Sequence, residues 1–156
     1  MFQKKENLLI WIDADGCPVI KETIAVARDY NIPVTLVKNH GIHLESDYAT
    51  IVTVEISRDA ADFYILSRMN PGDIVVTQDN GLCAMVLSKL GHCIDQNGKI
   101  IREEQIDFLL QSRHIHRKQR MQNQKGPKFK KRVARDNLFF TEALEKLLDH
   151  IFSEKP

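Results

Sequence analysis

Short apolar runs alternate with segments of helical periodicity along the first two thirds of this chain. The apolar or β-favouring runs are residues 8–12, 34–37, 50–56 and 73–77. The helical patterns that follow them are residues 18–30, 59–69 and 81–90. A continuous apolar run of this length is typical of a strand that is buried on both faces. The alternation therefore predicts a three-layer α/β/α fold, with helices on both sides of a mostly parallel central sheet.

The last third of the chain predicts a hairpin and two more helices. Asn97-Gly98 has the composition of a tight turn, so residues 93–101 are expected to form a short hairpin. Residues 103–122 begin acidic and end basic, an order that the helix dipole favours. A final amphipathic helix is expected over residues 137–152. Its predicted apolar face is Leu138, Phe139, Leu144, Leu147, Leu148 and Ile151.

Positive charge is concentrated in residues 113–135, which carry ten Lys or Arg and no acid. Residues 1–112 carry sixteen Asp or Glu against ten Lys or Arg, and residues 136–156 carry five acids against two bases. We interpret residues 113–135, the basic strap, as a contact for a polyanion, although a solvated helix face and loop is the alternative. We expect one domain over 1–156, formed by an α/β body (1–112), the strap and a C-terminal helix (136–156).

Composition and the absence of long apolar runs exclude several classes of protein. Hydrophobic residues make up 43% and charged residues 28%, values typical of a globular domain. No run approaches the roughly 18 apolar residues of a membrane span, and residues 1–7 do not resemble a signal peptide. We therefore expect a cytoplasmic protein without a membrane partner.

The three cysteines are odd in number and form no C-x-x-C pair. This pattern argues against a disulfide framework and a zinc site, so we interpret Cys17, Cys83 and Cys93 as reduced thiols. Cys17 lies at a predicted helix start, which can lower a thiol pKa, but the nearby Asp13 and Asp15 oppose that effect. A nucleophilic role for Cys17 is therefore disfavoured.

Carboxylates follow two of the predicted strands, at the ends where open α/β sheets bind ligands. Asp13 and Asp15 follow the first strand in the motif D-A-D-G-C-P, and Asp79 follows the fourth strand in T-Q-D-N-G-L. Two neighbouring parallel strands would bring Asp13 and Asp79 to one crevice. The alternative for Asp15 and Asp79 is that each caps the helix that follows it.

A third source of carboxylates is the helix that starts near residue 59. Asp59 and Asp62 are three residues apart and share a helix face, and Asp59 could act only as a cap. Asp62 lies among Ala, Phe, Tyr and Ile, where a buried acid is costly unless a cation or hydrogen bonds satisfy it. Carboxylates without Cys or paired His suit Mg²⁺ or Mn²⁺ and phosphodiester hydrolysis.

These segments resemble the acidic signature of PIN-like metal-dependent nucleases, and the whole chain is similar to the bacterial YaiI/YqxD family. The matching pieces are D-A-D-G-C-P from Asp13, residues 59–65, T-Q-D-N-G-L from Thr77, and Gly126-Pro127 before the last helix. The PIN resemblance implies a parallel sheet of order 3-2-1-4-5 and one or two Mg²⁺ or Mn²⁺ ions on Asp13, Asp62 and Asp79. PIN nucleases usually add a further acid, often Glu, for which Asp15 or Asp59 would have to substitute.

The leading hypothesis is a Mg²⁺- or Mn²⁺-dependent nuclease that hydrolyses RNA or another single-stranded nucleic acid. Asp13, Asp62 and Asp79 would be its catalytic metal ligands, and basic strap residues would contact phosphates. The predicted phosphate contacts are Arg117, Lys118, Arg120, Lys128, Lys130, Lys131 and Arg132.

Two alternatives remain open at this point. D-x-D-G after a first strand is also the nucleophile motif of haloacid-dehalogenase-like phosphatases, in which Asp13 would attack and Asp15 would act as acid and base. The later motifs of that family are weak in this chain. The other alternative is a non-catalytic RNA-binding module.

Overall fold

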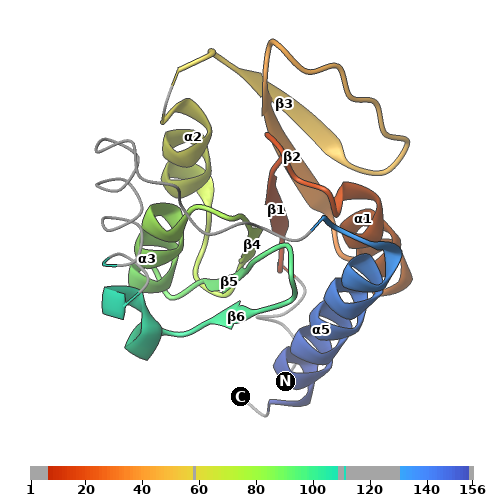
Figure 1. Ribbon diagram of the computed structural model, residues 1–156, viewed down its shortest axis with the longest axis vertical. Helices are drawn as coiled ribbons and strands as arrows, with labels where there is room; N and C mark the ends of the chain where they lie inside the picture. Colours follow the sequence, from red (N-terminus) through yellow and green to blue (C-terminus); the bar gives the residue numbers. More distant parts are fainter. Residues whose placement is uncertain (1–6, 58, 109–110, 112–130, 155–156) are drawn as a thin grey trace.

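The computed structural model describes residues 7–57, 59–108, 111 and 131–154. In these ranges, six strands form one sheet in the order β3-β2-β1-β4-β5-β6 (Figure 1). The strands are β1 (Ile10–Asp13), β2 (Val34–Asn39), β3 (Thr50–Val54), β4 (Ile74–Val76), β5 (His92–Ile94) and β6 (Ile100–Ile101). All neighbours pair in parallel except β5 and β6, which form the predicted hairpin. The predicted mostly parallel α/β fold and the strand order 3-2-1-4-5 are therefore confirmed.

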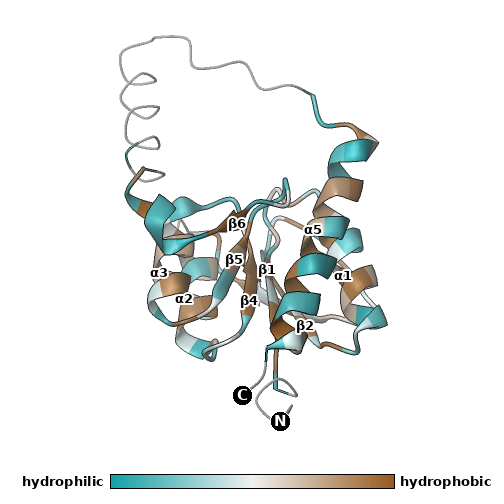
Figure 2. Ribbon diagram, turned by 90° about the horizontal axis from the view of Figure 1, so that it is seen from below, coloured by the Kyte–Doolittle hydropathy of each residue, from teal (hydrophilic) through white to brown (hydrophobic). Residues whose placement is uncertain are grey.

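Helices cover both faces of the sheet, with α1 and α5 on one side and α2 and α3 on the other (Figure 2). Their bounds are α1 (Ile20–Asp29), α2 (Ala60–Arg68), α3 (Asn80–Ser88) and α5 (Ala134–Ser153), and a 3-10 helix η2 (Glu103–Gln105) follows β6. No helix in the described ranges is long and apolar enough to cross a membrane.

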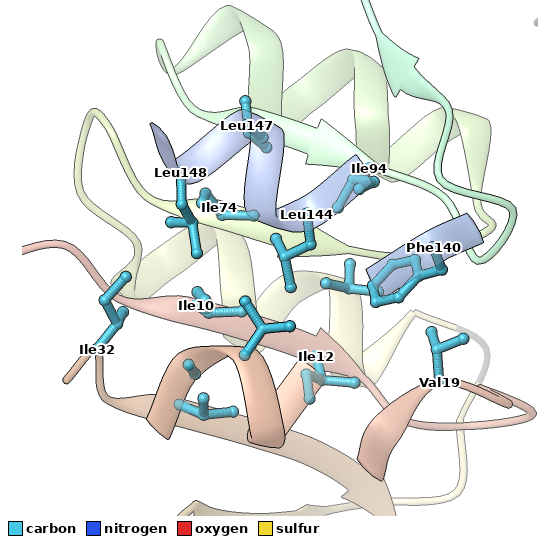
Figure 3. Close-up of a cluster of buried hydrophobic side chains, with 14 of the residues drawn as sticks. Ile10, Ile12, Val19, Ile32, Ile74, Ile94, Phe140, Leu144, Leu147 and Leu148 are labelled. Atoms are coloured by element: carbon cyan, nitrogen blue, oxygen red, sulfur yellow. The ribbon is translucent and has the colours of Figure 1, made fainter. Parts of the chain in front are cut away.

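Alternate side chains of each central strand enter two different cores. Ile10 and Ile12 of β1 pack in the core under α1 and α5, whereas Trp11 packs in the core under α2 and α3. Figure 3 shows the first core, in which Phe140 and Leu144 of α5 lie over the strands. Burial on both faces explains why the strands appear in the sequence as continuous apolar runs.

The apolar face of α5 differs from the predicted one at its N-terminal end. Leu144, Leu147, Leu148 and Ile151 are buried as predicted, but Leu138 and Phe139 are 58% and 63% exposed. Phe140 is buried in their place. The buried residues keep the spacing of a single helical stripe, and one residue of offset turns a side chain by about 100° around the helix axis. Leu138 and Phe139 therefore point away from the core.

Cys83 of α3 and Cys93 of β5 form a buried disulfide, with Cα atoms 5.7 Å apart. The interpretation of all three cysteines as reduced thiols is wrong for this pair. Their spacing of ten residues gave no signal, because only the packing of α3 against β5 brings the two side chains together. Cys17 is a free cysteine.

Asp73 is a buried carboxylate at the edge of the sheet where the parallel strands begin. Its oxygens accept hydrogen bonds from the Trp11 indole N–H at 3.0 Å and from the backbone N–H groups of Asn70 and Leu9 at 2.9 and 3.2 Å. Three donors satisfy the charge, so Asp73 holds β1 and β4 together without forming part of a site.

Candidate functional site

The candidate site lies at the carboxyl edge of the sheet, where β1, β2 and β4 end. β1 and β4 are neighbours, and Ile12 pairs with Val76 in the parallel register. The next residues along each strand are Asp13 and Thr77, so the register itself places these two side chains together. The predicted convergence of the first and fourth strands at one edge of the sheet follows from this pairing.

Thr77 connects the two predicted carboxylates. Its hydroxyl donates to Asp13 Oδ2 at 2.9 Å and accepts from the backbone N–H of Asp79 at 3.1 Å. The Thr77 side chain is almost fully buried, so this hydroxyl has little access to competing water. One residue therefore sets both the orientation of the Asp13 carboxylate and the path of the chain at Asp79.

Asp13 has a pKa raised above its ordinary value of 3.8. Burial is the largest cause, and the negative charges of Asp15 and Asp79 raise the pKa further. The hydrogen bond from Thr77 acts in the opposite direction but does not cancel these effects. Asp15 and Asp79 are therefore close enough to Asp13 to repel its negative charge.

Asp15 and Asp79 are each held by neighbouring donors. Asp15 accepts from the Asn39 side-chain N–H₂ at 2.9 Å and from its backbone N–H at 3.4 Å, which ties the loop after β1 to the end of β2. Asp79 accepts from the backbone N–H groups of Gly81 and Leu82 at 2.8 and 3.2 Å. Asp79 is thus both the cap of α3 and a member of the cluster, while Asp15 does not cap α1.

Asp59 and Asp62 lie at the start of α2, which follows β3. Asp59 occupies the N-cap position without a side-chain capping bond and is exposed, so the expected cap is not formed. Asp62 is partly buried in the first turn. Besides burial, the charges that raise the Asp13 pKa are those of Asp15 and Asp79. The structure thus gathers two of the three predicted ligands, together with Asp15.

In the described part of the chain, no group of three His, Cys, Asp or Glu side chains is arranged to hold a metal ion. Mg²⁺, however, keeps several waters and is usually bound through one or two carboxylates. Asp13 and Asp79 supply hard oxygen ligands. Burial raises the Asp13 pKa most, and a cation between the two carboxylates would offset the charge repulsion that adds to it. The donor set fits a hydrated Mg²⁺ or Mn²⁺ better than a closed site of protein ligands.

Cys17 does not have the properties of a nucleophile. Burial raises the pKa of its thiol, and the charge of Asp13 adds to the effect, while Arg132 opposes it. A thiol with a raised pKa stays protonated near neutral pH. This agrees with the expectation from the sequence.

Two of the predicted phosphate contacts, Lys131 and Arg132, lie within the described residues. Lys131 is exposed. Arg132 donates to the Gln96 carbonyl at 2.6 Å and to the side-chain oxygens of Asn97 at 3.0 Å and Asn137 at 2.6 Å. Arg132 therefore anchors the start of α5 to the turn after β5. The remaining predicted contacts lie outside the described residues: Arg117, Lys118, Arg120, Lys128 and Lys130.

Sequence reasoning missed Thr77, Asn39 and the anchoring role of Arg132. A Thr two residues before an Asp at a strand end is a pattern in which the hydroxyl can bond the local backbone, so T-Q-D held a usable signal for Thr77. Asn39 had none, because its contact with Asp15 depends on the pairing of β1 with β2. Arg132 gave no signal either, because nothing in the sequence distinguishes it from its basic neighbours.

Comparison with known proteins identifies one family over almost the whole chain. Residues 11–150 match the family described as "Uncharacterized BCR, YaiI/YqxD family". A UPF0178 protein of Exiguobacterium sibiricum is 44% identical over 141 residues, covering 89% of this chain and 95% of the relative. A UPF0178 protein of Bacillus pumilus is 33% identical over 151 residues, covering 95% and 90%. No solved structure matches. The chain belongs to the YaiI/YqxD family.

Proposed function

We propose that this protein is a Mg²⁺- or Mn²⁺-dependent phosphodiesterase of PIN-like type that cleaves single-stranded nucleic acid, RNA in particular. The observation that carries the proposal is the Asp13–Thr77–Asp79 arrangement at the carboxyl edge of the sheet. An enzyme gains nothing in stability from placing mutually repelling carboxylates together at a ligand-binding edge. Negative charges held close together favour a bound cation, and this is the property that a metal site uses.

Each residue of the cluster has a distinct proposed task. Asp13 and Asp79 would hold the ion, and Thr77 would fix their geometry through its hydroxyl. Asp15, held by Asn39, would add negative charge without moving toward the ion. Asp62, partly buried in the first turn of α2, is the third carboxylate that we propose for the site. A bound ion of this kind lowers the pKa of an attacking water and stabilises charge that develops on the phosphate oxygens.

The choice of a polyanionic substrate rests on the basic strap. The α/β body carries an excess of acidic residues and would repel nucleic acid by itself. The ten cations of residues 113–135 reverse that charge locally, and Arg132 anchors the end of the strap at the carboxyl edge. A polyanion on the strap would therefore reach the acidic cluster.

A cleavage assay tests the proposal. Labelled single-stranded RNA, single-stranded DNA and a chromogenic phosphomonoester are incubated with the full chain in Mn²⁺ and in chelator. We expect cleavage of RNA only with Mn²⁺, and we expect Asp13→Asn to reduce it to the level seen in chelator. Asp107→Asn, which changes an exposed acid after η2, is the matched control and should cleave normally.

Two outcomes contradict the proposal. Metal-independent cleavage of the phosphomonoester with a trapped aspartyl-phosphate on Asp13 would favour the phosphatase chemistry. RNA binding without any Mn²⁺-dependent cleavage would favour a binding module.

A further inference from the structure

The first two turns of α5 carry an exposed surface that combines positive charge with apolar side chains. Leu138 and Phe139 are 58% and 63% exposed, and Val133, just before the helix, is 51% exposed. Arg135 is also exposed and lies three and four residues before Leu138 and Phe139, so the three side chains are neighbours on the helix surface. We call Val133, Arg135, Leu138 and Phe139 the α5 patch.

The apolar part of the patch is confined to the start of the helix. Farther along, the same outward face carries the charged residues Glu142, Lys146 and Asp149, which are exposed. The opposite face of α5 supplies the buried stripe that holds the helix on the sheet. The packing of α5 on the sheet therefore does not require Leu138 and Phe139. Figure 2 shows apolar residues beside hydrophilic ones in the first turns of the helix.

The α5 patch begins at the edge of the sheet that carries the candidate site. Arg132, one residue before Val133, is hydrogen-bonded to the turn that follows β5 at the carboxyl edge. Arg132 also acts electrostatically on Cys17, as does Asp13, so these groups are near one another. The start of α5 and the acidic cluster thus occupy the same edge of the sheet.

We propose that the α5 patch binds a single-stranded nucleic acid, with a base stacked on Phe139 and with Arg135 and Lys131 on phosphates. Unpaired bases stack on aromatic rings whatever their sequence, and basic side chains beside the ring hold the backbone. Val133 and Arg135 are the last patch residues of the acid-free run 113–135, and Asp136 ends that run. The ten positive charges of the run favour a polyanion as the ligand. The nature of the ligand rests on the proposed function, and the patch would hold the strand that the acidic cluster cleaves.

The test measures binding without cleavage. A fluorescein-labelled single-stranded RNA is titrated with the full chain in chelator, and its anisotropy is followed. Phe139→Ala is expected to weaken binding roughly 5- to 150-fold, the range found when a stacked aromatic side chain is removed. Phe139→Trp should retain the affinity, and Arg135→Gln should flatten the dependence of log affinity on log salt by about 0.7.

A strand without bases separates stacking from charge. For an abasic ribose-phosphate strand of the same length, Phe139→Ala should change the affinity little, whereas Arg135→Gln should weaken it as it does for RNA. Leu90→Ala is the control for an exposed apolar side chain, because Leu90 is 74% exposed near the start of β4, at the opposite edge. Lys146→Gln is the control for charge, about 16 Å along α5 from Arg135.

Unchanged RNA affinity in Phe139→Ala overturns the inference. If Phe139→Ala changes the sedimentation coefficient but not the RNA affinity, the patch is an interface between copies of the chain. If Phe139→Ala loses only binding to anionic lipid vesicles, the patch is a membrane contact. Because the titration uses chelator, it is independent of catalysis. If the parent binds RNA but never cleaves it, and Phe139→Ala loses that binding, the result supports the patch and rejects the proposed function.

Discussion

At the scale of single residues, Asp13 is governed by two opposing effects. Burial and the charges of Asp15 and Asp79 disfavour its ionised form, while the Thr77 hydroxyl favours it. The balance leaves the pKa raised, so the folded protein carries an electrostatic cost at neutral pH in the absence of a cation. Each unit of raised pKa corresponds to about 1.4 kcal/mol of unfolding free energy. A bound cation would reverse this cost.

The cost predicts how stability depends on pH. Because the Asp13 pKa is higher in the folded state, the native state binds more protons than the unfolded state, and stability falls as the pH rises from 3.8 through the folded value. In chelator at pH 7, Asp13→Asn should therefore unfold at higher denaturant concentration than the parent. The difference should disappear below the ordinary pKa of Asp. A variant that is less stable at pH 7 would contradict this explanation.

Thr77 provides a second prediction at this scale. Thr77→Val keeps the shape of the side chain but removes the hydroxyl between Asp13 and Asp79, whereas Thr77→Ser keeps the hydroxyl. Calorimetric titration should show Mn²⁺ affinity reduced about 10- to 100-fold in Thr77→Val, as for other groups that orient metal ligands, and much less in Thr77→Ser. Equal losses in both variants would show that packing, not the hydroxyl, is responsible.

At the scale of secondary-structure elements, local patterns predicted most of the fold. The runs that end at Asp13 and Thr77 predicted β1 and β4, and their parallel pairing brought two expected carboxylates together. The errors arose where tertiary packing decides. The apolar face predicted for residues 137–152 includes Leu138 and Phe139, but only one stripe of the helix can face the sheet, and both side chains are exposed.

The turn between β5 and β6 gives an element-scale prediction. Gly98 has φ of +83°, and a Cβ there would lie 2.9 Å from the Ala143 Cβ of α5, so the hairpin packs directly on the helix. Gly98→Ala should destabilise the protein by roughly 1–3 kcal/mol through strain and overpacking.

Gly72 is the matched control for this prediction. Its φ is +92°, but an added Cβ would meet nothing within 4 Å. Gly72→Ala therefore reports backbone strain alone, and the excess loss in Gly98→Ala reports the contact with α5. Denaturant titration measures the loss of stability in each variant. Equal losses would mean that the hairpin moves away from α5 at no cost in stability.

At the scale of the whole molecule, charge is divided between an acidic body and a basic strap, and Arg132 belongs structurally to the body. Its three hydrogen bonds tie α5 to the turn after β5, so replacing it would disturb the fold together with any phosphate contact. A test of the strap must leave this residue unchanged. Lys128, Lys130 and Lys131 are the targets chosen, since all three carry the same charge as Arg132 and Lys131 is exposed.

Changing these three lysines together to Gln should lower the slope of log RNA affinity against log salt by about 2, because each phosphate contact on a single strand contributes about 0.7. The midpoint of denaturant unfolding should stay the same, and so should the Mn²⁺ titration, because Thr77 and Asn39 hold the acidic cluster. Arg132→Gln should instead lower the unfolding midpoint. If the triple variant keeps the parent slope, the strap's cations do not contact the RNA, and they would instead neutralise the acidic surface of the protein's own body.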